Sequence, residues 1–441
     1  MSAQPEIFVR TDIRHPRLRY VLRVVGEDLG YRFRFYNEHN VFAHAEPPYL
    51  ISYGGKAPRS LPAHPLLQGK PYSPADPASD FNIAPGGMPT MCQTPQGPDL
   101  LAAIFFCLSR YEEYQPFTPD AHGRFTASLS HAARFGYLHR PVVREWTAAL
   151  GATLRAWFPD LPPPARSPFA FQPSYDIDIL YAFSHRGWRG HASGVKDLLT
   201  GRFRRAAHRW FPGPRDPYDT LSELQHLHGE YGLRPWYFWL LSSRQHPHDP
   251  NPYPIPESQR AWMRHLDGEA ECGIHPSYLS SERPELFATE KERLETILNR
   301  PVARSRQHFL RFRLPDTYRA LIDAGIRSEA SMGYGDAVGW RAGTNRPFRW
   351  YDLDRENETK LVVHPFAAMD VTLRNYLGLD AAAARRAVVE LADATVPVGG
   401  PFVLLWHNSS FAGDYGWSGW WEMYRSLVGE LVGKGVVTNR P

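Results

Sequence analysis

Apolar segments that alternate with amphipathic segments constrain the fold of this chain more than any other feature. Short apolar runs typical of buried strands occur at Trp236–Leu241, Leu361–Val363 and Phe402–Trp406. Helical spacing, with start and stop signals such as proline and glycine, predicts helices at Pro217–Gly232, Pro284–Asn299, Pro315–Gly325 and Asp380–Thr395. This alternation predicts an α/β fold with a parallel sheet, either open or closed into a barrel.

A proline-rich segment, residues 158–173, separates this pattern from the first part of the chain. Its sequence, FPDLPPPARSPFAFQP, contains three consecutive prolines, which fix φ and remove backbone donors. Such a segment cannot continue a helix or lie inside a sheet, so we predict a domain boundary there. Residues 1–160 then form a smaller N-terminal domain of α+β or α/β type, with a strand at Tyr49–Tyr53.

A helix is predicted within this first domain at Leu100–Tyr114, with Asp99 as its N-cap. Its first half is apolar nearly all round, so we expect this half to be buried. We expect its charged end, with Arg110, Glu112 and Glu113, to be a solvated helix terminus, with a functional site as the alternative.

Composition excludes several classes of protein. The formal net charge of +4 over 441 residues gives no whole-chain case for nucleic-acid binding. We expect no membrane span, because no run of about 18 apolar residues occurs. Residues 1–10 lack the apolar core of a signal peptide, and three cysteines are too few for a disulfide framework. These features predict a cytoplasmic protein with reduced, buried cysteines, and they leave the oligomeric state open.

One basic segment, residues 186–215, stands apart from the rest of the chain. It carries eight lysines and arginines and a single acid, Asp197. A solvated basic helix is the simpler interpretation, and contact with an anionic glycan or a phosphate group is the alternative.

Polar residues that can carry chemistry lie at the ends of four predicted strands. They are Asp176 and Asp178, His275, Arg306 and His308, and His407. The carboxyl ends of barrel strands meet at one mouth of the barrel, where the active sites of such folds lie. We therefore expect these side chains to gather at one place.

A carboxylate combined with imidazoles is the ligand set of an open catalytic zinc site, in which water keeps one coordination position. The cation lowers the pKa of that water to about 7 and polarises a carbonyl oxygen. A free carboxylate can then take a proton from the water, and a histidine can protonate a departing amine. By pairing with Asp176, Arg306 would keep that carboxylate ionised. These residues predict metal-dependent hydrolysis of an amide or ester.

The order of these motifs resembles the carbohydrate esterase family 4 polysaccharide deacetylases, also called the NodB homology domain, over residues 168–437. Tyr175–Asp178 resembles the first motif of the family, in which a base aspartate precedes a metal-binding aspartate. The L-x-x-H motif is present and ends at His407. The resemblance implies a distorted (β/α)7 barrel, with Asp176 as base, Asp178 as metal ligand and His407 as general acid.

Two further motifs of the family are only partly present. The H-x-x-x-H motif begins at His275, but Leu279 takes the position of its second histidine. The arginine of the R-x-P-x-G motif is Arg306, and His308 stands at the proline position. Within the resemblance, Asp178, His275 and His308 form the metal site, with zinc as the expected ion, and Arg306 supports catalysis.

The layout also resembles a bacterial subgroup of deacetylase-like proteins with an uncharacterised N-terminal domain. The resemblance rests on short stretches at residues 109–114, 275–278, 305–308 and 340–344. Tyr278, Trp340 and Arg341 in these stretches are candidates for substrate binding. Trp417 joins them because flat aromatic rings stack on sugar faces, with core packing as the alternative role.

The function implied by the resemblance is removal of acetyl groups from an N-acetylated sugar or polysaccharide, with metal-bound water as the nucleophile. Two alternatives stay open. One is a hydrolase of another non-peptide C–N bond, such as a formamide or a cyclic amide. The other is a catalytically inactive glycan-binding barrel, which Leu279 in place of histidine favours.

Overall fold

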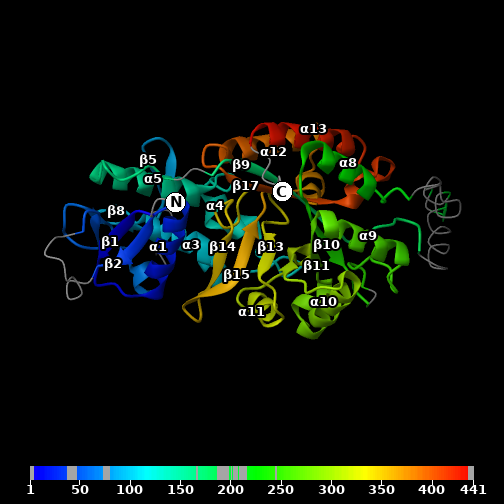
Figure 1. The fold of residues 1–441 in the computed structure, drawn as a ribbon, viewed down its shortest axis with the longest axis horizontal. Coiled ribbons are helices and arrows are strands. Elements are labelled where there is room, and N and C mark those ends of the chain that lie inside the picture. Colours follow the sequence, from blue (N-terminus) through cyan, green and yellow to red (C-terminus); the bar gives the residue numbers. More distant parts are fainter. Residues whose placement is uncertain are drawn as a thin grey trace.

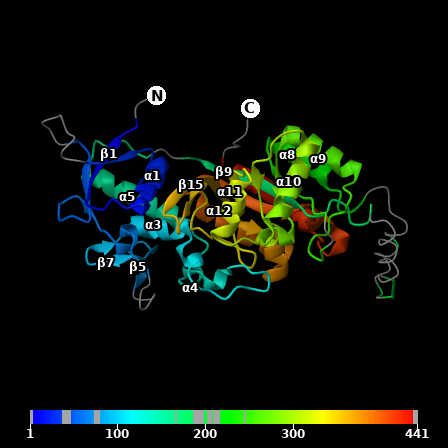
Figure 2. The ribbon, with the colours of Figure 1, turned by 90° about the horizontal axis from the view of Figure 1, so that it is seen from below.

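The computed structural model describes residues 4–36, 47–72, 80–164, 167–185, 216–243 and 246–435, together with positions 198, 199, 201 and 207. The basic segment at residues 186–215 therefore lies almost wholly outside the described residues, and both interpretations of it stay predictions. Figures 1 and 2 show an N-terminal part, in blue and cyan, beside a larger part, in green to red, that is built around a curled sheet.

The N-terminal part contains a four-stranded parallel sheet. Its strands are β1 (Glu6–Arg10), β2 (Arg32–Phe35), β3 (Leu50–Tyr53) and β4 (Ser60–Leu61), in the order β2-β1-β3-β4. The chain passes from β1 through helix α1 (Pro16–Leu29) to β2. Alternation along β1 buries Ile7 and Val9 in the core. This region is therefore of α/β type, and β3 confirms the strand predicted there.

Helices α1, α3 (Leu100–Ser109) and α5 (Val142–Trp157) pack against one another in this part. The side chain of Asp99 caps α3 by accepting a hydrogen bond from the amide of Ala102, as predicted. The predicted end of α3 is wrong, because Arg110 adopts a left-handed conformation with φ of 52° and stops the helix.

The N-terminal part also contains shorter elements. They are 3₁₀ turns at Pro65–Gln68, Tyr111–Tyr114 and Ala127–Leu129, helix α4 (His131–Arg134), and two hairpins, β5 (Asn82–Ala84) with β6 (Met88–Thr90) and β7 (Gln93–Thr94) with β8 (Gly97–Pro98).

The larger part is a curled sheet with the strand order β14-β15-β13-β12-β11-β10-β9-β17-β16 among the described residues. Every neighbouring pair is parallel except β14 with β15. Because β9 begins at Phe169 and lies between β10 and β17, the expectation that the segment 158–173 stays outside a sheet is wrong for residues 169–173. The strands are β9 (Phe169–Ile177), β10 (Trp236–Leu240), β11 (Glu271–His275), β12 (Arg304–Ser305), β13 (Ser328–Met332), β14 (Phe348–Asp352), β15 (Asn357–Pro365), β16 (Ala368–Met369) and β17 (Gly400–His407).

Two consecutive residues between β15 and β16 close this sheet into a barrel. The amide of Phe366 donates to the carbonyl of Met332 in β13, and the amide of Ala367 donates to the carbonyl of Val403 in β17. One continuous segment thus joins both edges of the sheet, so β15 and β16 share one strand position. Seven parallel positions result among the described residues, and the predicted distorted (β/α)7 barrel is confirmed.

The predicted helices of the barrel are all present, with ends that differ by a few residues. Gly232 ends its helix in a left-handed conformation, and the side chain of Asp380 caps the helix that follows it. The helices are α8 (Leu221–Tyr231), α9 (Glu257–Glu269), α10 (Pro284–Leu298), α11 (Asp316–Asp323), α12 (Ala381–Thr395) and α13 (Trp420–Gly433). Short turns occupy Tyr278–Ser281, His308–Leu310, Thr372–Tyr376, Asn408–Phe411 and Gly413–Tyr415. Across the described ranges, no helix has the length and apolar character needed to span a membrane.

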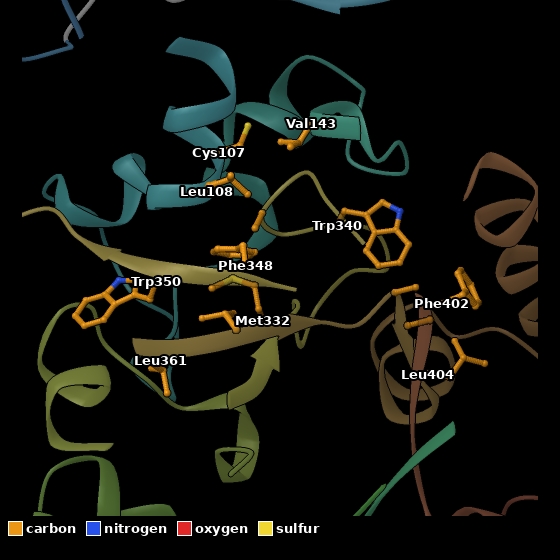
Figure 3. Close-up of a cluster of buried hydrophobic side chains, with 14 of the residues drawn as sticks. Cys107, Leu108, Val143, Met332, Trp340, Phe348, Trp350, Leu361, Phe402 and Leu404 are labelled. Atoms are coloured by element: carbon orange, nitrogen blue, oxygen red, sulfur yellow. The ribbon is translucent and has the colours of Figure 1, made fainter. Parts of the chain in front are cut away.

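One hydrophobic core runs through both parts of the chain. Figure 3 shows Cys107 of α3 and Val143 of α5 next to barrel side chains such as Phe348. Trp340 belongs to this core: its exposed fraction is 0%, and its ring packs edge-on against Phe402 with centroids 5.9 Å apart. The expected sugar-binding role of Trp340 is therefore wrong, because the ring is closed off from any ligand. The three cysteines are free and buried, as predicted.

A buried ion network links the N-terminal part to the barrel. Glu113 accepts hydrogen bonds from Arg341 at 2.6 and 2.8 Å and from Nε of Arg110 at 2.7 Å. The three side chains are only 2–4% exposed. Two predictions are therefore wrong: Arg110 and Glu113 are not a solvated helix terminus, and Arg341 is engaged in the core, where it cannot reach a substrate.

Candidate metal centre

The candidate residues lie at the carboxyl ends of neighbouring barrel strands. Asp176 is the penultimate residue of β9, and the strand register places it opposite His407, the last residue of β17. Asp178 follows β9 directly, and His275 is the last residue of β11. Arg306 follows β12 directly. The parallel sheet therefore brings together side chains that lie far apart in the sequence.

Asp178, His275 and His308 form a cluster suited to a cation. One ligand atom from each of them lies within 4.8 Å of the other two. The carboxylate of Asp178 bridges the imidazoles: Oδ1 is 3.2 Å from Nε2 of His275, and Oδ2 is 3.4 Å from Nε2 of His308. His308 lies in the turn after β12 and contributes the third donor of the cluster. It thereby compensates for Leu279, which occupies the position of the second histidine of the H-x-x-x-H motif.

Outer hydrogen bonds orient the two imidazoles of this cluster. Nδ1 of His275 lies 2.6 Å from the carbonyl oxygen of Arg306, which can only accept, so Nδ1 carries the proton. Nδ1 of His308 lies 3.0 Å from Oδ1 of Asp249. With Nδ1 as donor, Nε2 of each ring can present a lone pair toward Asp178, whose buried Oδ1 receives no hydrogen bond. Such a donor set fits a cation better than a closed hydrogen-bond network.

Arg306 fixes Asp176 beside the cluster. Its fully buried guanidinium donates to Oδ1 of Asp176 and to Oγ of Ser174, both at 2.9 Å, and lies over the ring of Phe238. The second carboxylate oxygen of Asp176, Oδ2, lies 3.6 Å from Nε2 of His275. One oxygen of this carboxylate is thus held by the arginine, while the other faces the cluster.

His407 faces the cluster from β17, which lies on the opposite side of β9 from β11. Its Nε2 is 3.7 Å from Oδ2 of Asp178. Its Nδ1 is 2.8 Å from Oδ1 of Asp370, a fully buried carboxylate that directly follows β16. Asp370 thus fixes Nδ1 of this imidazole, while Nε2 faces the cluster and can exchange a proton there.

The carboxylates make this centre favourable for positive charge. Burial lowers the pKa of His308, but the carboxylates of Asp178 and Asp249 together outweigh burial and raise that pKa to about 9. Burial likewise lowers the pKa of His407, and Asp370 with Asp178 raises it to about 10. Burial would raise the pKa of Asp178, but His308 and His407 hold it well below its usual range. A bound cation would supply the positive charge that protonated imidazoles supply here.

Two residues of the centre, Asp249 and Asp370, were not predicted from the sequence. Asp370 directly follows a strand, so the same search for polar residues at strand ends finds it once the two-residue strand β16 is recognised. Asp249 lies in the loop after β10, nine residues beyond the end of that strand, and no local signal marks it. Its role becomes visible only through its contacts with His308 and with the amide of Tyr278.

The two remaining substrate-binding candidates lie in different surroundings. Tyr278 is half-buried; its amide donates to Asp249, and its hydroxyl lies 3.0 Å from Nδ1 of His122 in the N-terminal part. Trp417 is half-buried and packs edge-on against Trp420, with the guanidinium of Arg374 over its ring. Tyr278 is thus tied to the centre through Asp249, whereas the contacts of Trp417 lie with its own segment and with Arg374. Substrate binding by both residues stays a prediction.

Comparison with family models gives one match, which covers the N-terminal part of the chain. Residues 7–159 match the model of a family of unknown function, DUF7033. A search of curated proteins found no match.

Solved structures similar to this chain include three proteins. One, an inferred polysaccharide deacetylase from Mycobacterium smegmatis, is 14% identical, with a TM-score of 0.40 over 61% of this chain and 85% of that one. A family 4 carbohydrate esterase from Streptomyces lividans, solved with acetate, is 10% identical, with a TM-score of 0.31 over 61% and 90% of the two chains. IcaB from Ammonifex degensii is 12% identical, with a TM-score of 0.23 over 38% and 86%. Likenesses this distant transfer no activity to this chain.

Proposed function

We propose that this chain is a metal-dependent hydrolase that removes acetyl groups from an N-acetylated sugar or polysaccharide. The observation that carries the proposal is the convergence of Asp178, His275 and His308 between Asp176 and His407. One carboxylate and two imidazoles leave coordination positions open, and zinc suits this donor set. The choice of an N-acetylated sugar rests on the motif resemblance.

The residues around the centre have distinct roles in the proposed reaction. When bound, a divalent cation would polarise the acyl carbonyl and acidify water. Asp176 accepts a proton at Oδ2 from the attacking water, while Arg306 holds its Oδ1 in place. His407 donates a proton from Nε2 to the departing amine, while Asp370 fixes Nδ1. The acyl C–N bond breaks, and acetate and a free amine are the products.

The substitution Asp176→Asn tests this assignment. It keeps the shape of the side chain but removes the base, so acetate release from N-acetylglucosamine oligosaccharides should cease while the bound metal is retained. Asp323→Asn, at an exposed position on α11, is the matched control and should behave as the wild type. Acetate release that survives Asp176→Asn would overturn the role of this residue.

The same assay separates the alternative functions. A wild-type protein that holds a metal and releases formate from formamides, or opens cyclic amides, would replace the proposed substrate class. A wild-type protein that retains no ion after exhaustive dialysis, and binds glycans without turnover, would replace the enzyme with a binding barrel.

A further inference from the structure

A second site is indicated in the N-terminal part, far from the barrel chemistry in the sequence. The strand order β2-β1-β3-β4 places β2 and β3 on opposite sides of β1. The chain leaves β1 toward the side of β2, through α1, and it leaves β3 toward the other side, where β4 lies. The loops that leave the carboxyl ends of β1 and β3 therefore diverge. In open parallel sheets, ligands bind in the crevice that such a divergence creates.

A crevice of about 1060 Å³ lies at this point. Its walls come from the loop after β1, residues 11–14, and from the loop after β3, residues 54–57. The second loop folds closely over the end of its own strand, since a Cβ atom on Gly55 would lie 2.2 Å from Oγ of Ser52. The volume is at the upper end of the range for small-molecule sites, so it suits a ligand of nucleotide size better than a simple ion.

The charge of the lining residues selects the class of ligand. Arg10, Arg14 and Lys56 line the crevice, and Asp12 is the one acid among the described lining residues. Within the part of the chain that the structure describes, no acidic side chain pairs with Arg14 or Lys56, and both are exposed. Arg14 is instead held by the carbonyl of Thr11. Guanidinium and ammonium groups converging on a polar pocket are the usual recognition elements for phosphate.

We propose that this crevice binds a phosphorylated small molecule through Arg14 and Lys56, with the carboxyl ends of β1 and β3 as its floor. The phosphate group lies between the two loops. The ring of Tyr36, which also lines the crevice and carries the guanidinium of Arg10 over its face, borders the remainder of the ligand. The proposal is independent of the hydrolase reaction, because none of these residues belongs to the metal centre.

Calorimetric titration of the full chain tests the site with UDP, pyrophosphate and uridine as probes. We expect one UDP per chain and weaker binding of pyrophosphate, while uridine, which lacks phosphate, gives no saturable heat. The double variant Arg14→Glu/Lys56→Glu should weaken UDP binding by about tenfold or more, because two charge-assisted contacts become repulsive. Both positions are exposed, so the fold should tolerate the change.

Two control variants locate the binding. Lys70→Glu reverses an exposed lysine of the same region outside the crevice, and it should bind UDP as the wild type does. His275→Ala disables the metal centre and should also leave UDP binding unchanged, which excludes capture of the phosphate by a metal in the barrel. The proposal is overturned if neither UDP nor pyrophosphate binds at millimolar concentration, or if Arg14→Glu/Lys56→Glu binds UDP as tightly as the wild type.

Discussion

Asp370 holds both the backbone and the ring of His407. Oδ2 of Asp370 accepts from the amide of His407 at 2.8 Å, and Oδ1 lies 2.8 Å from its Nδ1. Asp370 directly follows β16, and β16 pairs with β17, the strand that ends at His407. The pairing that closes the barrel thus also sets the direction of Nε2 of His407, which faces Asp178.

Replacing Asp370 should therefore impair the proposed general acid without removing the metal. We expect Asp370→Asn to lower kcat by about 100-fold and to leave KM little changed. A loss of this size is typical when a general acid is no longer held in its productive orientation. Steady-state acetate release and metal analysis of the same preparation measure both effects. Asp380→Asn is the control, because asparagine caps a helix about as well as aspartate and Asp380 caps α12. Joint loss of metal and activity in Asp370→Asn would contradict an orienting role.

Metal content tests the cluster itself. The wild type should hold about one divalent ion per chain, the stoichiometry of a single open site, and His308→Ala should lose it. Asp249→Asn should retain the ion with an affinity lower by about 10- to 100-fold, because Asp249 orients His308 and is not itself a member of the cluster. Competition with a chelator, followed by metal analysis, gives these affinities. His246→Ala replaces a nearby histidine outside the cluster and serves as the control. Unchanged metal content in His308→Ala would remove this residue from the site.

The central residues of the candidate site could be predicted because each carries a local signal. Asp178, His275 and His407 are polar residues that directly follow or end an apolar run, and such positions converge wherever parallel strands form a barrel. His308 needed an additional step, since it lies beyond the very short strand β12. The alternation of strands and helices also predicted the barrel, because that pattern is periodic and local.

The errors concern residues whose surroundings are set by distant parts of the chain. The sequence around Arg341 gives no sign that Glu113, 228 residues earlier, meets it in the core. A buried tryptophan such as Trp340 and an exposed, sugar-binding tryptophan look alike in the sequence. They differ in the side chains that pack against the ring, which for Trp340 include Phe402. Asp249 has no periodic or strand-end signal, because loop residues are positioned by tertiary contacts. Burial and long-range pairing were therefore the properties that one sequence did not provide.

The buried Glu113 network should dominate the coupling between the two parts of the chain. Glu113→Gln leaves the buried guanidinium of Arg341 without its carboxylate partner, while Arg110 keeps only its ion pair with Glu112 at 2.8 Å. We expect the free energy of unfolding to fall by about 3–5 kcal/mol, the usual effect of removing one partner of a buried ion pair. Chemical denaturation monitored by tryptophan fluorescence measures this change. Glu282→Gln, which breaks the exposed pair with Arg311, should cost less than about 1 kcal/mol. Similar effects of the two variants would contradict the buried network.

Acid sensitivity should arise in part from His228, a buried residue of α8. Burial lowers its pKa to about 3, and its Nε2 lies 2.8 Å from the hydroxyl of Tyr175. In the unfolded chain this histidine has a pKa of about 6.5, so protons bind the unfolded state first as the pH falls. Its contribution to stability is therefore complete above about pH 6.5 and is lost progressively toward pH 3.

Replacing His228 should make the protein less sensitive to acid. Between pH 7 and pH 5, this group should account for a loss of about 2 kcal/mol, at about 1.4 kcal/mol per unit of pKa difference. We expect His228→Gln to be less stable than the wild type at pH 7, because a core contact is lost, but to lose less stability between the two pH values. Urea unfolding at both pH values measures the difference. His226→Gln, at an exposed position two residues earlier on α8, should follow the wild type. Parallel losses in His228→Gln and the wild type would mean that His228 is not buried in its neutral form.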